Sequence, residues 1–421
     1  MPSDPAESDK GPEMMLGAFL QEEAAEKEQV AKFELKPTPK PTLKDKQYPP
    51  GTMVVKTEYA SICGSDFPGK GGCAGCNCWR RPLGYLPVLA NYQICGGTGH
   101  ELVGKVVEVQ EPCQYKIGQR VLGMSPAYIK WLIADEFEKL SGYKADEVFE
   151  KPQGGFAEYF LSHEVVCLPV PTTSPYFDPR LFVMAQPLGT ILHGMNRLDS
   201  NLVGKTVAIV GQGQNGLLWT QMIAGCKPRK LIVLDLLPER LEVAKKKYNV
   251  THSIHVDPTM DDKIMITFVE DQVSAITNGE LCDVIIDAVG HQSKTFTICS
   301  SIAKKNGILV LFGLPPGPQE EQQMSIRSDY FYKNLEYITT STPTIDEFQY
   351  AIELLEQGRF DPSGLITHTM SFQKSFSKAY DIASNYKNGV IKVLLTFDGE
   401  NDAVDGDGGN INNNEQDDGN H

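Results

Sequence analysis

The chain has 421 residues, of which 41% are hydrophobic and 22% charged, and its formal net charge is −15. This apolar content suits roughly two or three folded domains and excludes a wholly disordered chain. The acidic excess opposes non-specific binding to nucleic acid, and no apolar run is long enough to predict a membrane-spanning helix.

The predicted elements, taken in chain order, divide the chain into regions of different composition and secondary structure. Residues 1–32 are polar, and we expect a partly disordered extension with one short helix over Met14–Val30. From Thr52, short apolar runs separated by Gly and Pro predict a β-rich region. From Lys205, apolar runs at 206–210, 230–235, 282–288 and 307–312 alternate with helical stretches, which indicates a doubly wound parallel sheet. A helix at 345–357 and a strand at 391–397 precede an acidic tail, residues 398–421, whose composition predicts disorder.

A glycine-rich segment follows the first of these alternating runs. Gly211, Gly213 and Gly216 have the G-x-G-x-x-G spacing, with a strand before them and a helix after them, and the same loop contains Gln214 and Asn215. Such a loop permits a tight turn and lets a pyrophosphate approach the helix N-terminus. At the end of the next strand, Asp235 can accept the ribose hydroxyls of adenosine and would repel a 2′-phosphate, which favours NAD over NADP. The competing interpretation is a glycine turn without a ligand.

Two fragments of the β-rich region carry metal-type donors. Cys63, Ser65 and Asp66 lie in ASICGSD, and His100 and Glu101 lie in GTGHEL. Thiolate, imidazole and carboxylate together suit Zn²⁺ in a site with an open position. With ten cysteines and no export signal, we expect reduced thiols in a cytoplasmic protein. Spacing alone leaves open whether the two fragments share a metal.

The order of these motifs, together with GQRV, GGFAEY, QPL, DPSGLITH and IKVLLTF, resembles the zinc-dependent medium-chain dehydrogenase/reductase superfamily. Within it, the GHE triplet and the QPL segment are most similar to the sorbitol and threonine dehydrogenase branch. The resemblance implies an α/β architecture in which a Rossmann NAD-binding domain, residues 191–336, interrupts a GroES-like catalytic domain, residues 33–190 and 337–397. It also implies a homodimer or homotetramer acting on a small alcohol or carbonyl compound.

The same resemblance implies roles for individual residues. Cys63, His100 and Glu101 would ligate the catalytic zinc, and Asp66 would hydrogen-bond the ring of His100. Ser65 would contact the substrate oxygen and pass on its proton. Two further residues would serve the cofactor: Thr190 would line the nicotinamide pocket, and Lys392 would approach the phosphates.

The sequence departs from the family pattern at three places. Gln186 stands where polyol-type members usually have Glu. An amide oxygen can bind zinc or hold a zinc-bound water, but more weakly than a carboxylate does. Pro68 replaces a histidine that completes the proton relay in many members. The usual four-cysteine structural zinc lobe is absent, and a dense group lies elsewhere, in Cys73, Cys76, Cys78 and Cys95. That group fits a second metal site, an insertion with inert thiols, or a loop that shapes the substrate entrance.

These observations predict an NAD-dependent zinc enzyme that moves hydride between the cofactor and a secondary alcohol, a polyol or a related hydroxy compound, in either direction. One alternative is a zinc-free reductase of the same fold, acting on activated double bonds or quinones, which Gln186 leaves open. The other alternative is a non-catalytic NAD-binding scaffold protein with a relic site.

Overall fold

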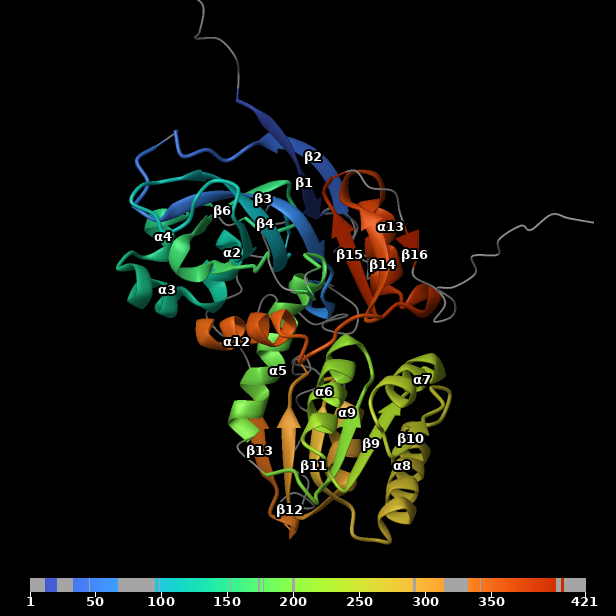
Figure 1. Ribbon diagram of the computed structural model, residues 1–421. Helices are drawn as coiled ribbons and strands as arrows, with labels where there is room; N and C mark the ends of the chain where they lie inside the picture. Colours follow the sequence, from blue (N-terminus) through green and yellow to red (C-terminus); the bar gives the residue numbers. More distant parts are fainter. Residues whose placement is uncertain are drawn as a thin grey trace, which may run out of the picture.

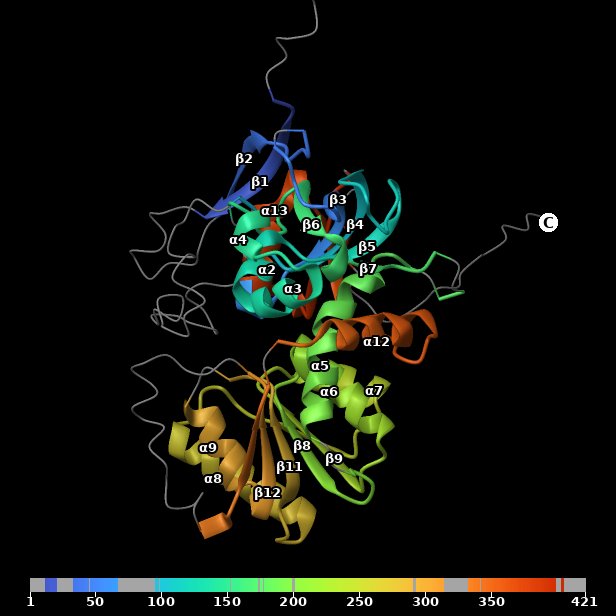
Figure 2. The same ribbon diagram turned by 90° about the vertical axis from the view of Figure 1, so that its left-hand side faces the viewer.

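The computed structural model describes residues 12–20, 33–44, 46–66, 95–97, 99–151, 153–172, 175–176, 178–198, 201–290, 293–313, 332–340, 342–398 and 403–404. Two large sheets lie one above the other, with helices α5 (Ala185–Leu198) and α12 (Ile345–Glu356) between them, and a separate two-stranded sheet lies beside the upper one (Figures 1 and 2). Within the described ranges, every helix is too short or too polar to cross a bilayer.

The lower sheet in Figure 1 is the predicted doubly wound one. Its six parallel strands have the order β10-β9-β8-β11-β12-β13, the arrangement of a Rossmann fold. In chain order the strands are β8 (Thr206–Val210), β9 (Lys230–Asp235), β10 (His252–His255), β11 (Cys282–Asp287), β12 (Ala303–Leu311) and β13 (Glu336–Thr339). The helices are α6 (Gln214–Gly225), α7 (Pro238–Lys247), α8 (Asp262–Thr277) and α9 (Ser293–Ser301). Strands β8 and β11 are buried along their whole length, as expected for a sheet covered on both faces.

The upper sheet has the order β16-β14-β15-β3-β4-β5-β7, and β6 also pairs with β3. Its strands are β3 (Thr52–Ser61), β4 (Glu101–Val109), β5 (Arg120–Gly123), β6 (Tyr159–His163), β7 (Leu168–Pro169), β14 (Ile366–Ser371), β15 (Lys392–Thr396) and β16 (Ala403–Val404). Strand β15 comes from the end of the chain and pairs antiparallel with β3, which places Leu394 opposite Ser61. The C-terminal segment therefore completes a sheet that the N-terminal segment begins.

The predicted helix over Met14–Val30 is wrong at its N-terminal end. Residues Met14–Leu20 form strand β1, which pairs antiparallel with β2 (Phe33–Pro39). The backbone N–H of Ala18 donates to the carbonyl of Phe156 at 2.9 Å, and the N–H of Gly96 donates to the carbonyl of Ala18 at 2.9 Å. These long-range partners favour a strand over local helix propensity. Residues 21–32 lie outside the described residues, as does most of the predicted acidic tail.

A helical lobe occupies the place where the four-cysteine lobe is missing. It contains α2 (Pro126–Leu132), α3 (Ala134–Ser141) and α4 (Ala145–Val148), directly after β5. The dipeptide Ser125–Pro126 starts α2, because the serine hydroxyl accepts the Tyr128 N–H and proline suits the first helical position. The side chain of Phe137 in α3 is fully buried, so the lobe packs as part of the main core.

The remaining helices connect the two sheets or cover the upper one. They are α5, α12 and α13 (Phe372–Ser384), with 3₁₀ turns η1 (Gly64–Asp66), η3 (Glu164–Val166), η4 (Leu181–Met184) and η5 (Lys387–Gly389). Helix α12 packs on α5, where His193 Nδ1 lies 3.0 Å from Glu347 Oε2. The lower sheet extends to Thr339, three residues beyond the predicted end of the Rossmann region, before the chain returns to the upper sheet.

Candidate metal and nucleotide site

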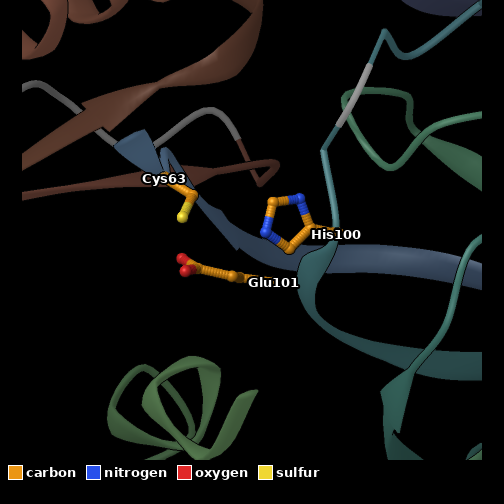
Figure 3. A group of neighbouring side chains, drawn as sticks. All are labelled: Cys63, His100 and Glu101. Atoms are coloured by element: carbon orange, nitrogen blue, oxygen red, sulfur yellow. The ribbon is translucent and has the colours of Figure 1, made fainter. Parts of the chain in front are cut away.

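The two metal-type fragments meet at the end of one strand pair. Cys63 follows β3 and His100 immediately precedes β4, and these strands pair so that Ser61 lies opposite Glu101. The ligand atoms of Cys63, His100 and Glu101 all lie within 4.8 Å of one another, and their side chains point toward one place (Figure 3). A thiolate, an imidazole and a carboxylate at this spacing fit a tetrahedral zinc site with one open position.

Asp66 organises the first two of these donors. Its Oδ2 accepts the backbone N–H of Cys63 at 2.8 Å, and its Oδ1 lies 3.4 Å from His100 Nδ1. Burial by itself lowers the pKa of His100, but Asp66 and Cys63 outweigh it and hold this pKa well above its ordinary value. The backbone carbonyl of Asp66 also accepts the hydroxyl of Tyr380 from α13 at 2.8 Å. Nothing in the sequence pattern indicates a role for Tyr380.

Glu101 is fully buried, with its two oxygens in different environments. Its Oε2 accepts the hydroxyl of Ser61 and the ammonium of Lys392, whose side chain is also fully buried. Among the described residues, no group donates to Oε1. A buried carboxylate oxygen without a protein partner, beside a thiol and an imidazole, is the arrangement that a metal ligand requires.

Lys392 connects this donor group to the nucleotide loop. Besides Glu101, its Nζ donates to Gln214 Oε1 at 2.5 Å, and Gln214 is the first residue of α6. The metal-type donors of the upper sheet and the glycine loop of the lower sheet therefore lie next to each other. The expected contact of Lys392 with cofactor phosphates stays a prediction, because its ammonium is engaged by these two side chains.

The glycines of the loop have the geometry that a dinucleotide needs. Gly211 has φ +90°, and a Cβ on Gly216 would lie 1.9 Å from the Gly211 carbonyl oxygen. A Cβ on Gly213 would meet Arg240 Nη1 at 3.5 Å, with no other described atom within 4 Å. Space beside Gly213 and close packing at Gly216 correspond to the separate tasks of the second and third glycines in such loops.

Other predicted cofactor residues surround this loop. Within the described ranges, two buried atoms have no partner there, Gln214 Nε2 and Asn215 Oδ1. Asp235 ends β9, and its carboxylate accepts the N–H of Gln212 at 2.5 Å and that of Leu237 at 2.8 Å. Thr190 lies in α5, where its hydroxyl donates to the Pro187 carbonyl at 2.6 Å. The unpartnered atoms and the open glycine fit a nicotinamide dinucleotide.

Gln186 and Ser65 are the two remaining residues predicted to be catalytic. Gln186, in the first turn of α5, is 7% exposed and lies near the side chain of Tyr128 in α2. Tyr128 in turn stacks on His100. Ser65 is half-buried in η1, two residues after Cys63. No motif in the sequence pointed to Tyr128.

The candidate second metal site cannot be assembled from the described residues. Cys73, Cys76, Cys78 and Pro68 lie outside them. Cys95 is described and half-buried, and burial raises the pKa of its thiol to about 12. The second metal site therefore stays a prediction.

Comparison with known proteins identifies the family and agrees with the fold. Residues 49–172 match the alcohol dehydrogenase GroES-like domain family, and residues 213–357 match the zinc-binding dehydrogenase family. The chain belongs to the zinc-dependent medium-chain dehydrogenase superfamily. The predicted family and fold class, a Rossmann sheet with a GroES-like domain, are confirmed, as is the prediction of an oxidoreductase with zinc and a nicotinamide nucleotide as cofactors.

Individual relatives are distant but cover most of the chain. An L-threonine 3-dehydrogenase of Chelativorans sp. is 27% identical, over 76% of this chain and 85% of its own. A zinc-binding dehydrogenase of Clostridium scindens has a similar structure, with a TM-score of 0.69 and 19% identity over 91% of this chain and 99% of its own. A zinc-binding dehydrogenase of Sinorhizobium meliloti, solved bound to NADP, has a TM-score of 0.65 and 23% identity over 91% and 100% of the chains. The expected likeness to the threonine dehydrogenase branch is confirmed.

Proposed function

We propose that this protein is a zinc- and NAD-dependent dehydrogenase that transfers hydride between NAD and a secondary alcohol, a polyol or a related hydroxy compound, and that it catalyses the reverse carbonyl reduction. The observation that carries the proposal is the contact of Lys392 with both Glu101 and Gln214. It puts the donor group and the glycine loop side by side, as hydride transfer between a metal-held substrate and a nicotinamide requires.

The chain's own residues have distinct tasks in this proposal. Cys63, His100 and Glu101 would hold the zinc, which when bound would polarise the substrate oxygen and lower the pKa of an alcohol. Asp66 orients His100 and fixes which ring nitrogen faces the metal. The hydroxyl of Ser65 accepts the alcohol proton and at the same time passes its own proton on to water.

The cofactor half of the site has its own set of residues. The backbone N–H groups at the start of α6 receive the pyrophosphate, since no described side chain caps this helix. Asp235 accepts the ribose hydroxyls of NAD. Thr190, in the first turns of α5, contacts the nicotinamide.

The two alternative functions make different demands on the same residues. A zinc-free reductase would need neither Cys63 nor His100, and it would gain nothing from a buried Glu101 with an unpartnered oxygen. A scaffold protein would bind NADH without turnover. The convergence of three donor types within 4.8 Å favours the zinc enzyme over both.

The experiment is to measure zinc content and the formation or consumption of NADH with a panel of secondary alcohols, polyols, β-hydroxy amino acids, quinones and compounds with an activated double bond. The wild-type protein should hold about one zinc at this site and turn over a member of the panel. Cys63→Ser should lose both, while Cys113→Ser, which changes another half-buried thiol, should keep both. Turnover that survives in Cys63→Ser would establish the zinc-free reductase instead, and NADH binding without turnover would establish the scaffold.

We also propose a cytoplasmic homodimer or homotetramer. The family resemblance supports the oligomer, and ten cysteines in 421 residues, far below the density of a disulfide-rich secreted chain, support the reducing compartment. Light scattering on the purified protein measures the assembly, and a monomeric mass at micromolar concentration would contradict this proposal.

A further inference from the structure

A chain of three polar side chains links the metal-type donors to the nucleotide loop. Glu101 and Lys392 are both fully buried and form an ion pair through Glu101 Oε2. The same ammonium donates to Gln214 Oε1 at 2.5 Å, and Gln214 begins α6 immediately after Gly213. The positive charge of Lys392 is therefore balanced by a carboxylate on one side and directed at a neutral amide on the other.

The contact with Lys392 fixes the orientation of the Gln214 amide. An ammonium group donates hydrogen bonds and cannot accept them, so the amide oxygen has to face Lys392 and the amide nitrogen, Nε2, is turned away from it. This nitrogen is buried and has no hydrogen-bond partner among the described residues. A buried amide N–H without an acceptor is destabilising, which indicates an acceptor that a ligand supplies.

The place of this donor matches the part of a dinucleotide that carries negative charge. Gln214 lies in the first turn of α6, at the positive end of the helix dipole, and no described side chain caps this helix. The pyrophosphate of a dinucleotide binds at this end of the first helix of a Rossmann sheet. A Cβ on the preceding Gly213 would have no described atom within 4 Å except Arg240 Nη1, so the loop beside Gln214 leaves room for a ligand.

We propose that Gln214 is a phosphate-binding residue whose amide N–H donates to the cofactor pyrophosphate, and that Lys392 is the positioning residue that orients it. This inference rests on the proposed NAD-dependent function. Lys392 then contributes to cofactor binding through Gln214 rather than by its own contact with the phosphates. The donor at the pyrophosphate is neutral, and Glu101 compensates the lysine charge that orients it.

The test measures NADH binding to the full chain by fluorescence titration, with ADP-ribose and adenosine as competitors. ADP-ribose keeps the pyrophosphate of NADH, whereas adenosine has no phosphate. Gln214→Met removes the amide, and Gln214→Glu keeps an oxygen for Lys392 but removes the N–H donor. The matched control is Gln221→Met, because Gln221 also lies in α6 and its amide pairs with the backbone of Asp361.

Both Gln214 variants should bind NADH and ADP-ribose about tenfold to a hundredfold more weakly than the wild type, since a hydrogen bond to a charged group is lost. Gln214→Glu should lose the most, because a carboxylate repels the pyrophosphate. Adenosine should bind every Gln214 variant like the wild type, and Gln221→Met should match the wild type with all three ligands. Lys392→Met should also weaken NADH binding, but not further when Gln214→Met is already present. Circular dichroism shows whether Lys392→Met is folded, and the Gln214 variants test the contact without it.

The results that would overturn the inference are distinguishable. Wild-type protein that binds no NADH removes the cofactor half of the proposed function, and the role of Gln214 with it. If both Gln214 variants bind NADH as Gln221→Met does, the proposed function stands and Gln214 is an ordinary structural residue. A loss of the same size for adenosine as for ADP-ribose would place the contact away from the pyrophosphate. Additive effects of Lys392→Met and Gln214→Met would mean that Lys392 does not act through the amide.

Discussion

Replacing Lys392 with methionine should destabilise the protein strongly, because it leaves the buried carboxylate of Glu101 without its cation. Both side chains are 0% exposed. Removing one partner of a buried ion pair costs about 3–5 kcal/mol. The Ser61 hydroxyl still donates to the same oxygen of Glu101, so the lower end of that range applies. A loss of about 3 kcal/mol raises the unfolding equilibrium constant roughly 150-fold.

The assay is urea unfolding of metal-free protein, followed by tryptophan fluorescence. Trp131 lies in α2, in the same part of the molecule as Lys392, and reports on that part. The matched control is Lys387→Met, which removes an exposed lysine 2.7 Å from Asp381. Exposed pairs of this kind contribute at most about 1 kcal/mol.

A double variant separates the missing charge from other effects of the substitution. Lys392→Met/Glu101→Gln removes both charges and should regain most of the lost stability, since no buried charge is left alone. The reasoning is refuted if Lys392→Met unfolds at the same urea concentration as Lys387→Met, or if the double variant is less stable than Lys392→Met.

Three further substitutions test the loop and the upper sheet. Gly213→Ala should fold like the wild type but bind NADH at least about tenfold more weakly by fluorescence titration, because its methyl group takes the pyrophosphate's place. Gly216→Ala should lower the melting temperature even without cofactor, because its Cβ would lie 1.9 Å from the Gly211 oxygen. Burial raises the pKa of Glu58, but its ion pairs, chiefly with Arg120, outweigh burial and hold this pKa below its ordinary value. Glu58→Gln should therefore lower the free energy of unfolding by about 2 kcal/mol at neutral pH. The difference in this free energy between variant and wild type should disappear as pH falls below 4.5 and through the folded pKa of Glu58. A difference that persists at pH 2 would contradict this assignment.

The parts of the molecule that the sequence predicted are those where the pattern is local. The run Thr206–Val210, the glycine spacing and Asp235 lie within about thirty residues and dictate a strand, a turn and a helix in that order. Cys63 and His100 were nominated together through motif order, and strand pairing between β3 and β4 brings them together.

What the sequence did not reveal depends on partners far along the chain. Strand β1 needs Phe156 and Gly96 to satisfy its backbone, and a single-sequence pattern does not contain that information. Tyr128 lies in a helix without a recognisable motif, and only the packed structure shows its ring over His100. Lys392 was assigned to the cofactor from its position in a motif, whereas its charge first neutralises Glu101.

The closing of the upper sheet by β15 has a consequence for biosynthesis. Glu101 leaves the ribosome about 290 residues before Lys392, a delay of about 15–60 s at typical elongation rates. During that time β3 lacks its β15 partner, and the carboxylate destined for burial lacks its cation. The Rossmann segment is synthesised entirely within this interval, so it can fold while the sheet that surrounds the metal ligands still has an open edge. A nascent chain halted before residue 392 should therefore bind NADH but not zinc.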